Sequence, residues 1–144
     1  MIHIAEKKDV ETLAGLAMLM WKSHSVQELV EEFSEIMENG ESAFFLAEKE
    51  REVIGFAQCQ LRHDYVEGTE SSPVGYLEGI FVKEEYRHNG YAMRLLKECE
   101  SWARLRGCTE FASDCELSNN TSLSFHLSAG FEETNRIICF TKRL

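Results

Sequence analysis

The sequence predicts an α/β protein with a mixed central sheet flanked by helices. Apolar residues recur at helical spacing in several long segments, and apolar runs of strand length lie between these segments. In the C-terminal half, strand-like and helix-like segments alternate, which is typical of α/β chains. A length of 144 residues, with one proline and no linker-like or repeated stretch, favours a single domain over residues 1–144.

The N-terminal part is predicted to form a short strand and two helices. The apolar run over 1–5 is consistent with a strand, and the spacing of leucine, alanine and methionine predicts a helix over about 9–22. A second helix begins after Ser25, which forms a capping box with Glu28. Gly40 follows its last turn, where glycine commonly ends a helix.

The middle of the chain changes to the pattern of strands. Segments 42–50 and 52–62 flank a polar turn, which predicts an antiparallel hairpin. A polar loop over 63–73 leads to a third apolar run over 74–82. These segments supply the central strands of the predicted sheet.

The C-terminal part is predicted to alternate between helices and strands. A helix over 91–107 is followed by a strand over 108–114, a helix over 119–129 and a last strand over 135–143. The predicted order is therefore β-α-α-β-β-β-α-β-α-β. The longest helix presents one apolar face, made of Leu95, Leu96, Cys99, Trp102 and Ala103.

The charge of the chain restricts its partners. Twenty-five acidic and fifteen basic residues give a formal net charge of -10, which disfavours nucleic acid and anionic membrane surfaces and favours a cationic substrate. No apolar run approaches the roughly 18 residues that span a bilayer. The first residues lack the long apolar core of a signal peptide. Five cysteines, an odd number with no CxxC spacing, favour a reduced, cytoplasmic protein.

The segment 87-RHNGYA-92 is the first candidate for a functional site. It connects an apolar run to a helix, and such a turn offers unpaired N–H groups and the positive end of the helix dipole to an anion. Gly90 and Ala92 leave the backbone accessible, and Arg87 adds a guanidinium that matches phosphate oxygens. The spacing fits neither a Walker loop nor a dinucleotide fingerprint. A plain helix start with a surface arginine is the alternative.

Two segments together resemble the GNAT acyltransferases. RHNGYA is similar to the R-x-x-G-x-[GA] turn by which those enzymes grip the pyrophosphate of acetyl-CoA, and 119-NNTSLSFHLSAGF-131 is similar to their C-terminal helix beside the coenzyme. The resemblance implies the GNAT fold, with a splayed strand pair holding acetyl-CoA as cosubstrate and with no metal. It implies the following coenzyme-binding residues: Ile80, Phe81, Val82, Arg87, His88, Asn89, Gly90, Tyr91, Ala92, Asn119, Ser122 and His126.

Further blocks resemble the aminoglycoside 6'-N-acetyltransferases. These are 62-RHDYVEGTESSPVGYLEGIFV-82, 112-ASD-114 and 130-GFEET-134. The resemblance implies direct transfer of an acetyl group to the 6'-amine of an aminoglycoside antibiotic, and hence resistance. Transfer to a polyamine, a peptide N-terminus or another small amine is the alternative. A coenzyme-binding module without catalysis is a third hypothesis.

Three side chains are candidates for catalysis. A carboxylate at Glu78 is unexpected in an apolar strand, and Asp114 ends the next strand, so either can accept the proton of the attacking amine. The base is left open between them. His126 stands where many relatives have tyrosine, so it either protonates the leaving thiolate or bonds to the coenzyme. The Val82 N–H is the candidate to stabilise the oxyanion.

Recognition of the acceptor is assigned to two loops. Trp21, His24 and Tyr65 are expected to border the sugar rings, with Glu78 and Asp114 at the amine. The acidic loop residues Asp64, Glu67 and Glu70 are expected to meet other ammonium groups. A homodimer is expected from the resemblance and from the apolar run 137-IICF-140.

Overall fold

The computed structural model describes residues 1–144 and contains one five-stranded sheet in the order β1-β2-β3-β4-β5. All neighbouring strands are antiparallel except β4 and β5, which are parallel, so the sheet is mixed as predicted. The strands are β1 (Ile2–Ile4), β2 (Ser42–Lys49), β3 (Glu52–Arg62), β4 (Val74–Val82) and β5 (Phe111–Ser113). The helices are α1 (Val10–Met20), α2 (Val26–Glu38), α3 (Tyr91–Leu105) and α4 (Asn120–Ser128), with short 3-10 turns at Lys7–Asp9 and Glu84–Tyr86.

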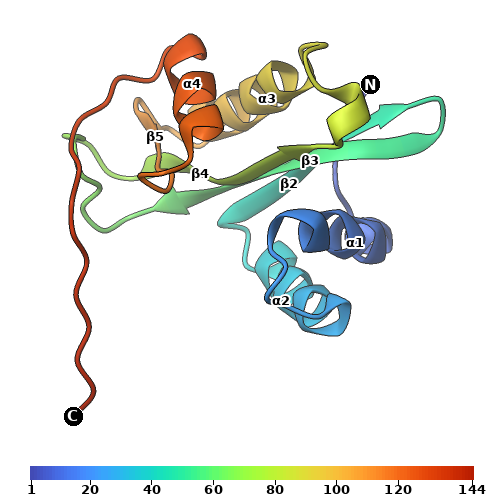
Figure 1. Cartoon of the computed structure of the whole chain (residues 1–144), viewed down its shortest axis with the longest axis horizontal. Helices are drawn as coiled ribbons and strands as arrows, with labels where there is room; N and C mark the ends of the chain where they lie inside the picture. Colours follow the sequence, from blue (N-terminus) through green and yellow to red (C-terminus); the bar gives the residue numbers. More distant parts are fainter.

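The helices cover the two faces of the sheet in pairs (Figure 1). Helices α1 and α2 lie on one face, and α3 and α4 lie on the other. The face predicted for α3 is confirmed, because its buried residues are the five expected from the spacing. We call the two sides of the sheet the α1/α2 face and the α3/α4 face. No helix is long and apolar enough to cross a bilayer.

Local sequence signals explain the ends of several elements. The Ser25 hydroxyl accepts a hydrogen bond from the Glu28 N–H (3.1 Å), as the predicted cap of α2 requires. The Glu28 carboxylate does not complete the capping box and lies instead 3.6 Å from His24 Nδ1. Glu50 and Arg51, at φ of 51° and 69°, form the tight turn of the predicted β2–β3 hairpin.

A β-bulge interrupts β4 at Glu78. Gln58 of β3 is paired with Gly79, and the next residue of β3, Cys59, is paired with Leu77, so Glu78 is an extra residue on β4. A Cβ added to Gly79 would lie 2.7 Å from Trp21 Cζ2, so Gly79 also faces helix α1. The bulge therefore places two consecutive positions of β4 on the α1/α2 face.

Strands β4 and β5 part soon after they meet. Their pairing covers only three residues of each strand and ends at Leu77 and Ser113. From Glu78 to Val82, β4 has no neighbour on that side, although it remains paired with β3. This is the splayed strand pair expected for the fold.

The predicted final strand over 135–143 is wrong. Residues 131–144 contain no helix or strand, and the chain leaves the body of the protein as an extended tail (Figure 1). Ile138 and Phe140 are 80% and 87% exposed. A strand needs a neighbouring backbone to satisfy its N–H and C=O groups, and none lies beside this tail within one copy of the chain. The strand predicted over 108–114 is also shorter, at Phe111–Ser113.

Candidate active site

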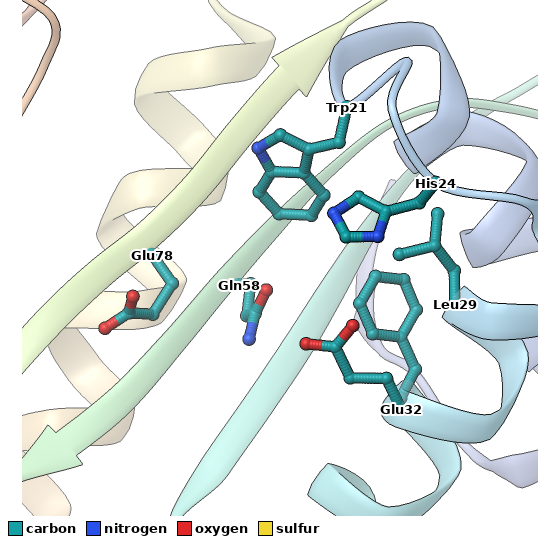
Figure 2. Close-up of a pocket in the computed structure, with 7 residues that line it drawn as sticks. Trp21, His24, Leu29, Glu32, Gln58 and Glu78 are labelled. Carbon is teal, nitrogen blue, oxygen red and sulfur yellow. The ribbon is translucent and has the colours of Figure 1, made fainter. Parts of the chain in front are cut away.

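A pocket of about 230 Å³ opens on the α1/α2 face beside the bulge (Figure 2). Aromatic side chains of Trp21 and Phe33 form part of its wall. Glu78 from β4 and Glu32 from α2 bring carboxylates to opposite sides of it. A hollow with an apolar wall and carboxylates suits an amine carried on a sugar-like ring.

Four of the five predicted acceptor residues line this pocket or a second one, and Asp114 lines neither. Trp21 and His24 line the first pocket, as Glu78 does. Trp21 is also packed edge-on against Phe56, with ring centroids 5.9 Å apart, so it is part of the core as well. Tyr65 lines the second pocket and is 76% exposed.

The acidic loop residues behave differently from one another. Asp64 lines the second pocket. Glu67 accepts a hydrogen bond from Asn135 of the tail (3.0 Å), and neither Glu67 nor Glu70 lines the two pockets. Asp64 is therefore the only one of the three that reaches these hollows.

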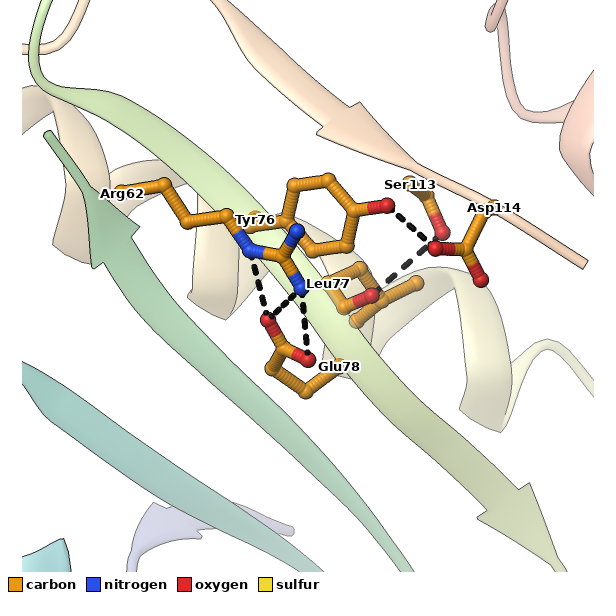
Figure 3. A network of polar contacts seen from close by, with 6 residues as sticks. All are labelled: Arg62, Tyr76, Leu77, Glu78, Ser113 and Asp114. Carbon is orange, nitrogen blue, oxygen red and sulfur yellow. Dashed lines mark hydrogen bonds and ion pairs between the residues drawn. The ribbon is translucent and has the colours of Figure 1, made fainter. Parts of the chain in front are cut away.

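An ion pair on β3 and β4 joins the two pockets (Figure 3). Arg62 Nη2 lies 2.7 Å and 3.1 Å from the two carboxylate oxygens of Glu78, and Arg62 Nε donates to the nearer one at 3.1 Å. The guanidinium carbon lies 3.5 Å from the centroid of the Tyr76 ring, which is a close cation–π contact. Glu78 is thus fixed from the side of β3.

Tyr76 connects this ion pair to the second predicted carboxylate. Its side chain is buried, and its hydroxyl donates to the carboxylate of Asp114, which follows β5 (Figure 3). Burial raises the pKa of Tyr76 well above its usual value, and the hydrogen bond to Asp114 raises it further. The hydroxyl therefore stays protonated and remains a donor, while exposed Asp114 keeps further acceptor sites.

His126 lies on the opposite face of the sheet, against Ser113. Its Nε2 is 2.7 Å from Ser113 Oγ, and its Nδ1 is 2.7 Å from the Ser122 carbonyl oxygen. A carbonyl only accepts, so Nδ1 carries a hydrogen. Because Ser113 Oγ can accept or donate, the site satisfies both the neutral and the charged form of the imidazole.

The other two polar residues predicted on α4 support this arrangement. Asn119 Oδ1 caps the helix by accepting from the Ser122 N–H (3.1 Å), which leaves the Asn119 amide nitrogen without a partner in the chain. The Ser122 hydroxyl lies 3.3 Å from His126 Nδ1. Ser122 therefore contacts His126 directly, whereas Asn119 fixes the first turn of the helix that carries both.

The RHNGYA turn has the shape required for an anion. His88 and Gly90 have left-handed backbones, at φ of 64° and 84°, and Asn89 Nδ2 folds the turn by donating to the Tyr86 and Arg87 carbonyls. A Cβ at Gly90 would meet nothing within 4 Å, so the approach to the turn is open. The first amides of α3, at Tyr91 and Ala92, have no backbone acceptor.

Arg87 links this turn to the free edge of β4. Its Nε donates to the Val82 carbonyl (2.8 Å), and its two terminal amino groups have no partner in the chain. The Lys83 N–H donates to the Ile54 carbonyl of β3, and successive residues of a strand turn their peptide groups to opposite edges. The N–H groups of Val82 and Ile80 are therefore directed at the gap between β4 and β5. Phe81 turns its side chain to the α1/α2 face, against Phe56.

A turn with free amides and an arginine, followed along β4 by an unpaired edge, fits a ligand with phosphates and an amide-containing arm. A sequence model described as the acetyltransferase (GNAT) family matches residues 10–131. The chain belongs to the GNAT family of acetyltransferases. Acetyl-CoA is its cosubstrate. No group of three or more His, Cys, Asp and Glu side chains is arranged as a metal site.

Relatives of this GNAT acetyltransferase cover its whole length. It is 39% identical over 99% of its residues to the aminoglycoside N(6')-acetyltransferase type 1 of Salmonella enteritidis, of which 98% is covered. The corresponding enzyme of Acinetobacter baumannii is 38% identical, over 98% of this chain and 96% of the relative. The predicted family and the resemblance to aminoglycoside 6'-N-acetyltransferases are confirmed.

Solved structures agree with the fold of this GNAT acetyltransferase. AAC(6')-Iy, in complex with the bisubstrate analogue CoA-S-monomethyl-acetylneamine, superposes with a TM-score of 0.96 at 38% identity, over 100% of this chain and 98% of that one. AAC(6')-Ih from Acinetobacter baumannii superposes with a TM-score of 0.94 at 35% identity, also over 100% and 98%. The predicted GNAT fold is confirmed.

Several residues of the candidate site were not predicted from the sequence. Arg62 and Tyr76 lie in the segment 62–82 that resembles the aminoglycoside 6'-N-acetyltransferases, but neither receives a role in the sequence analysis. Period-2 alternation places Arg62, at the end of β3, on the same face as Gln58, and this signal could have identified it. Ser113 meets His126, and Glu32 reaches the pocket, only through tertiary packing, so the local sequence pattern gives no indication of either.

Proposed function

We propose that this protein transfers the acetyl group of acetyl-CoA directly to the 6'-amine of an aminoglycoside. The observation that carries the proposal is the carboxylate-lined pocket beside the bulge of β4, next to the free edge expected to hold the coenzyme. Relatives that are 39% and 38% identical over nearly the whole chain are named as aminoglycoside N(6')-acetyltransferases. These names agree with the activity predicted from the sequence.

The acceptor amine must lose a proton before or during its attack. An amine that titrates like lysine, with a pKa of about 10.4, is neutral in only about one molecule in 10³ to 10⁴ at pH 7. Glu78 and Asp114 are the two carboxylates placed to hold the ammonium group and to accept its proton, directly or through water. Asp114 is the more accessible of the two, because Arg62 already occupies both oxygens of Glu78.

Acetyl-CoA supplies the thioester, and backbone and side-chain groups of this chain act on it from the free edge of β4. The Val82 N–H donates to the thioester oxygen as negative charge develops there. Ile80 continues this free edge, along which an added arm pairs like a strand, whereas the peptide groups of Phe81 face β3. Arg87, Gly90 and the first amides of α3 hold the phosphates.

His126 is proposed as the proton source for the leaving sulfur. In its charged form, Nε2–H donates to Ser113 Oγ while Nδ1–H donates to the Ser122 carbonyl. When the carbon–sulfur bond breaks, Ser113 passes its hydroxyl proton to the sulfur and takes the Nε2 proton of His126. The thiol forms and His126 becomes neutral, so the charges balance.

An acceptor screen tests the proposed function. Purified protein is incubated with acetyl-CoA and kanamycin, tobramycin, a polyamine or a peptide, and the release of CoA is measured. We expect turnover with the aminoglycosides and none with an aminoglycoside that carries a hydroxyl in place of the 6'-amine. Turnover of a polyamine or peptide without any aminoglycoside turnover would refute the assignment of the acceptor.

We further infer that residues 1–144 are one domain and that the protein acts as a cytoplasmic homodimer. The exposed tail, with Ile138 and Phe140 uncovered, supports a second copy of this chain as the partner that supplies the missing neighbouring strand. The five free cysteines support a reducing compartment. Ile138→Asp should shift the dimer to monomer in light scattering, and an unchanged mass would refute this role of the tail.

A further inference from the structure

Two requirements of the acceptor site oppose each other. Carboxylates attract the ammonium group of the acceptor, but the same charges raise its pKa and keep it protonated. Glu78, Asp114 and Glu32 all contribute negative charge on the α1/α2 face. A site with only these charges would bind the substrate in its unreactive form.

Arg62 is the basic group that counteracts this charge, and its geometry is well defined. Three donor–acceptor contacts of 2.7 to 3.1 Å join its guanidinium to Glu78. The guanidinium carbon of Arg62 lies over the Tyr76 ring, 3.5 Å from the ring centroid. The Arg62 and Glu78 side chains are 37% and 22% exposed, so the pair is partly shielded from solvent.

We propose that Arg62 is a positioning residue that lowers the negative charge of the acceptor site, so that the amine is held there without being kept protonated. This proposal rests on the proposed function, because it concerns the same acceptor site. Arg62 acts through Glu78: it fixes the carboxylate and cancels one unit of its charge. Asp114, which accepts a hydrogen bond from Tyr76 but has no basic partner, is then the carboxylate that takes the proton.

Other ionisable groups around this site do not replace Arg62. His24 lies beside Glu28, at 3.6 Å, and His63 beside Glu41, at 2.8 Å, so each histidine already faces a carboxylate. The ionisable groups that line the two pockets or the network between them are the following: His24 between α1 and α2, Glu32 on α2, Arg62 on β3, His63, Asp64 and Tyr65 after β3, Tyr76 and Glu78 on β4, and Asp114 after β5.

The expected effect follows from Coulomb's law. A unit charge about 6 Å from an amine shifts its pKa by about two units at an effective dielectric constant of about 20, and by about half a unit in water. Arg62 is 37% exposed, so the shift should lie between these limits, near one unit. Below that pKa, one unit corresponds to about a tenfold change in the neutral fraction of the bound amine.

The test compares Arg62→Gln with Arg62→Lys in the full-length protein. For Arg62→Gln we expect the rising limb of kcat against pH to move to higher pH by about one unit. We also expect kcat at pH 7 to fall about tenfold and the acceptor KM to stay equal or fall. Arg62→Lys keeps the charge and should retain the wild-type pH profile. Lys7→Gln removes the same charge from an exposed pair with Glu38 and is the matched control.

The direction in which the acceptor KM moves, together with the pH profile, distinguishes this role from a structural one. A merely structural ion pair predicts a lower kcat with a higher KM and no shift in the pH profile, and that result would overturn the proposal. A dependence of kcat on pH that is the same in Arg62→Gln as in the wild type would also overturn the proposal. Melting curves and circular dichroism of each variant show whether the fold is kept.

A second measurement does not require turnover. Calorimetric titration at about pH 10, close to the ordinary pKa of about 10.4 for such an amine, is done in two buffers of different ionisation enthalpy and gives the protons taken up when an aminoglycoside binds. Subtracting the proton uptake measured with the 6'-hydroxyl analogue leaves the proton uptake that belongs to the 6'-amine. Arg62→Gln should increase that uptake, and an unchanged uptake would refute the role of Arg62 even if the acceptor screen found a different substrate. Absence of aminoglycoside turnover alone would refute the proposed function instead.

Discussion

Replacement of Arg87 separates binding of the coenzyme from binding of the acceptor. In Arg87→Ala the two terminal amino groups that have no partner in the chain are lost, together with the Nε hydrogen bond to the Val82 carbonyl (2.8 Å). One hydrogen bond to a charged group contributes about 1.5–3 kcal/mol, which corresponds to about a 10- to 150-fold change in affinity. We expect the KM for acetyl-CoA to rise within this range.

The assay is steady-state kinetics with each substrate varied at saturation of the other. The KM of the acceptor should change by less than about threefold, because Arg87 lies at the turn before α3 and not on the acceptor pocket. Arg104→Gln, at the far end of the same helix, is the charge-matched control and should change neither constant. Equal rises in both KM values for Arg87→Ala would contradict a phosphate-binding role.

Three further predictions concern the two faces of the site. Glu78→Gln combined with Asp114→Asn should lower kcat/KM by about 10² to 10⁴, the usual range for a general base, while acetyl-CoA still binds; unchanged turnover would favour a coenzyme-binding module without catalysis. Ser113→Ala and His126→Gln should each lower kcat, and the double variant should be no slower than the slower single variant; additive losses would exclude a shared proton path. Burial and the Asp114 hydrogen bond raise the pKa of Tyr76, so its stabilising contribution is complete below about pH 10 and is lost as pH rises through the folded-state value. The difference in unfolding free energy between wild type and Tyr76→Phe should therefore be constant below about pH 10 and shrink above it, and a difference that persists at higher pH would refute this.

Local patterns predicted the elements whose cause is local. The apolar face of α3 follows from 3.6-residue spacing alone, and all five predicted positions are buried. The cap at Ser25 and the hairpin turn at Glu50 and Arg51 depend on neighbouring residues, so they too were predictable. The open turn before α3 was predictable for the same reason, since its glycine, arginine and helix start lie within one hexapeptide, and its role in binding the coenzyme stays a prediction.

The failures all depend on contacts that are distant in sequence. Residues 135–143 have the composition of a strand, but a strand also needs a neighbour, and one copy of the chain does not provide it. The bulge at Glu78 depends on the register between β3 and β4, which no single segment encodes. Arg62 pairs with a residue 16 positions away, so its role could not be read from its own block.

The bulge also divides β4 into two stretches whose alternation is out of phase. From Gly79 to Val82 the strand presents a backbone edge, while from Val74 to Glu78 it contributes Tyr76 and Glu78 side chains to the acceptor side. Substitutions before the bulge can therefore alter which amines are accepted and leave the donor edge as it is. A one-residue deletion at Glu78 would do more than remove a carboxylate. Leu77 would then precede Gly79 directly, so the alternation would become regular, with Tyr76 still on the α1/α2 face and one fewer position of β4 beside the pocket. The extra residue thus keeps the positions of β4 that line the proposed acceptor pocket separate from the backbone edge that β5 leaves free.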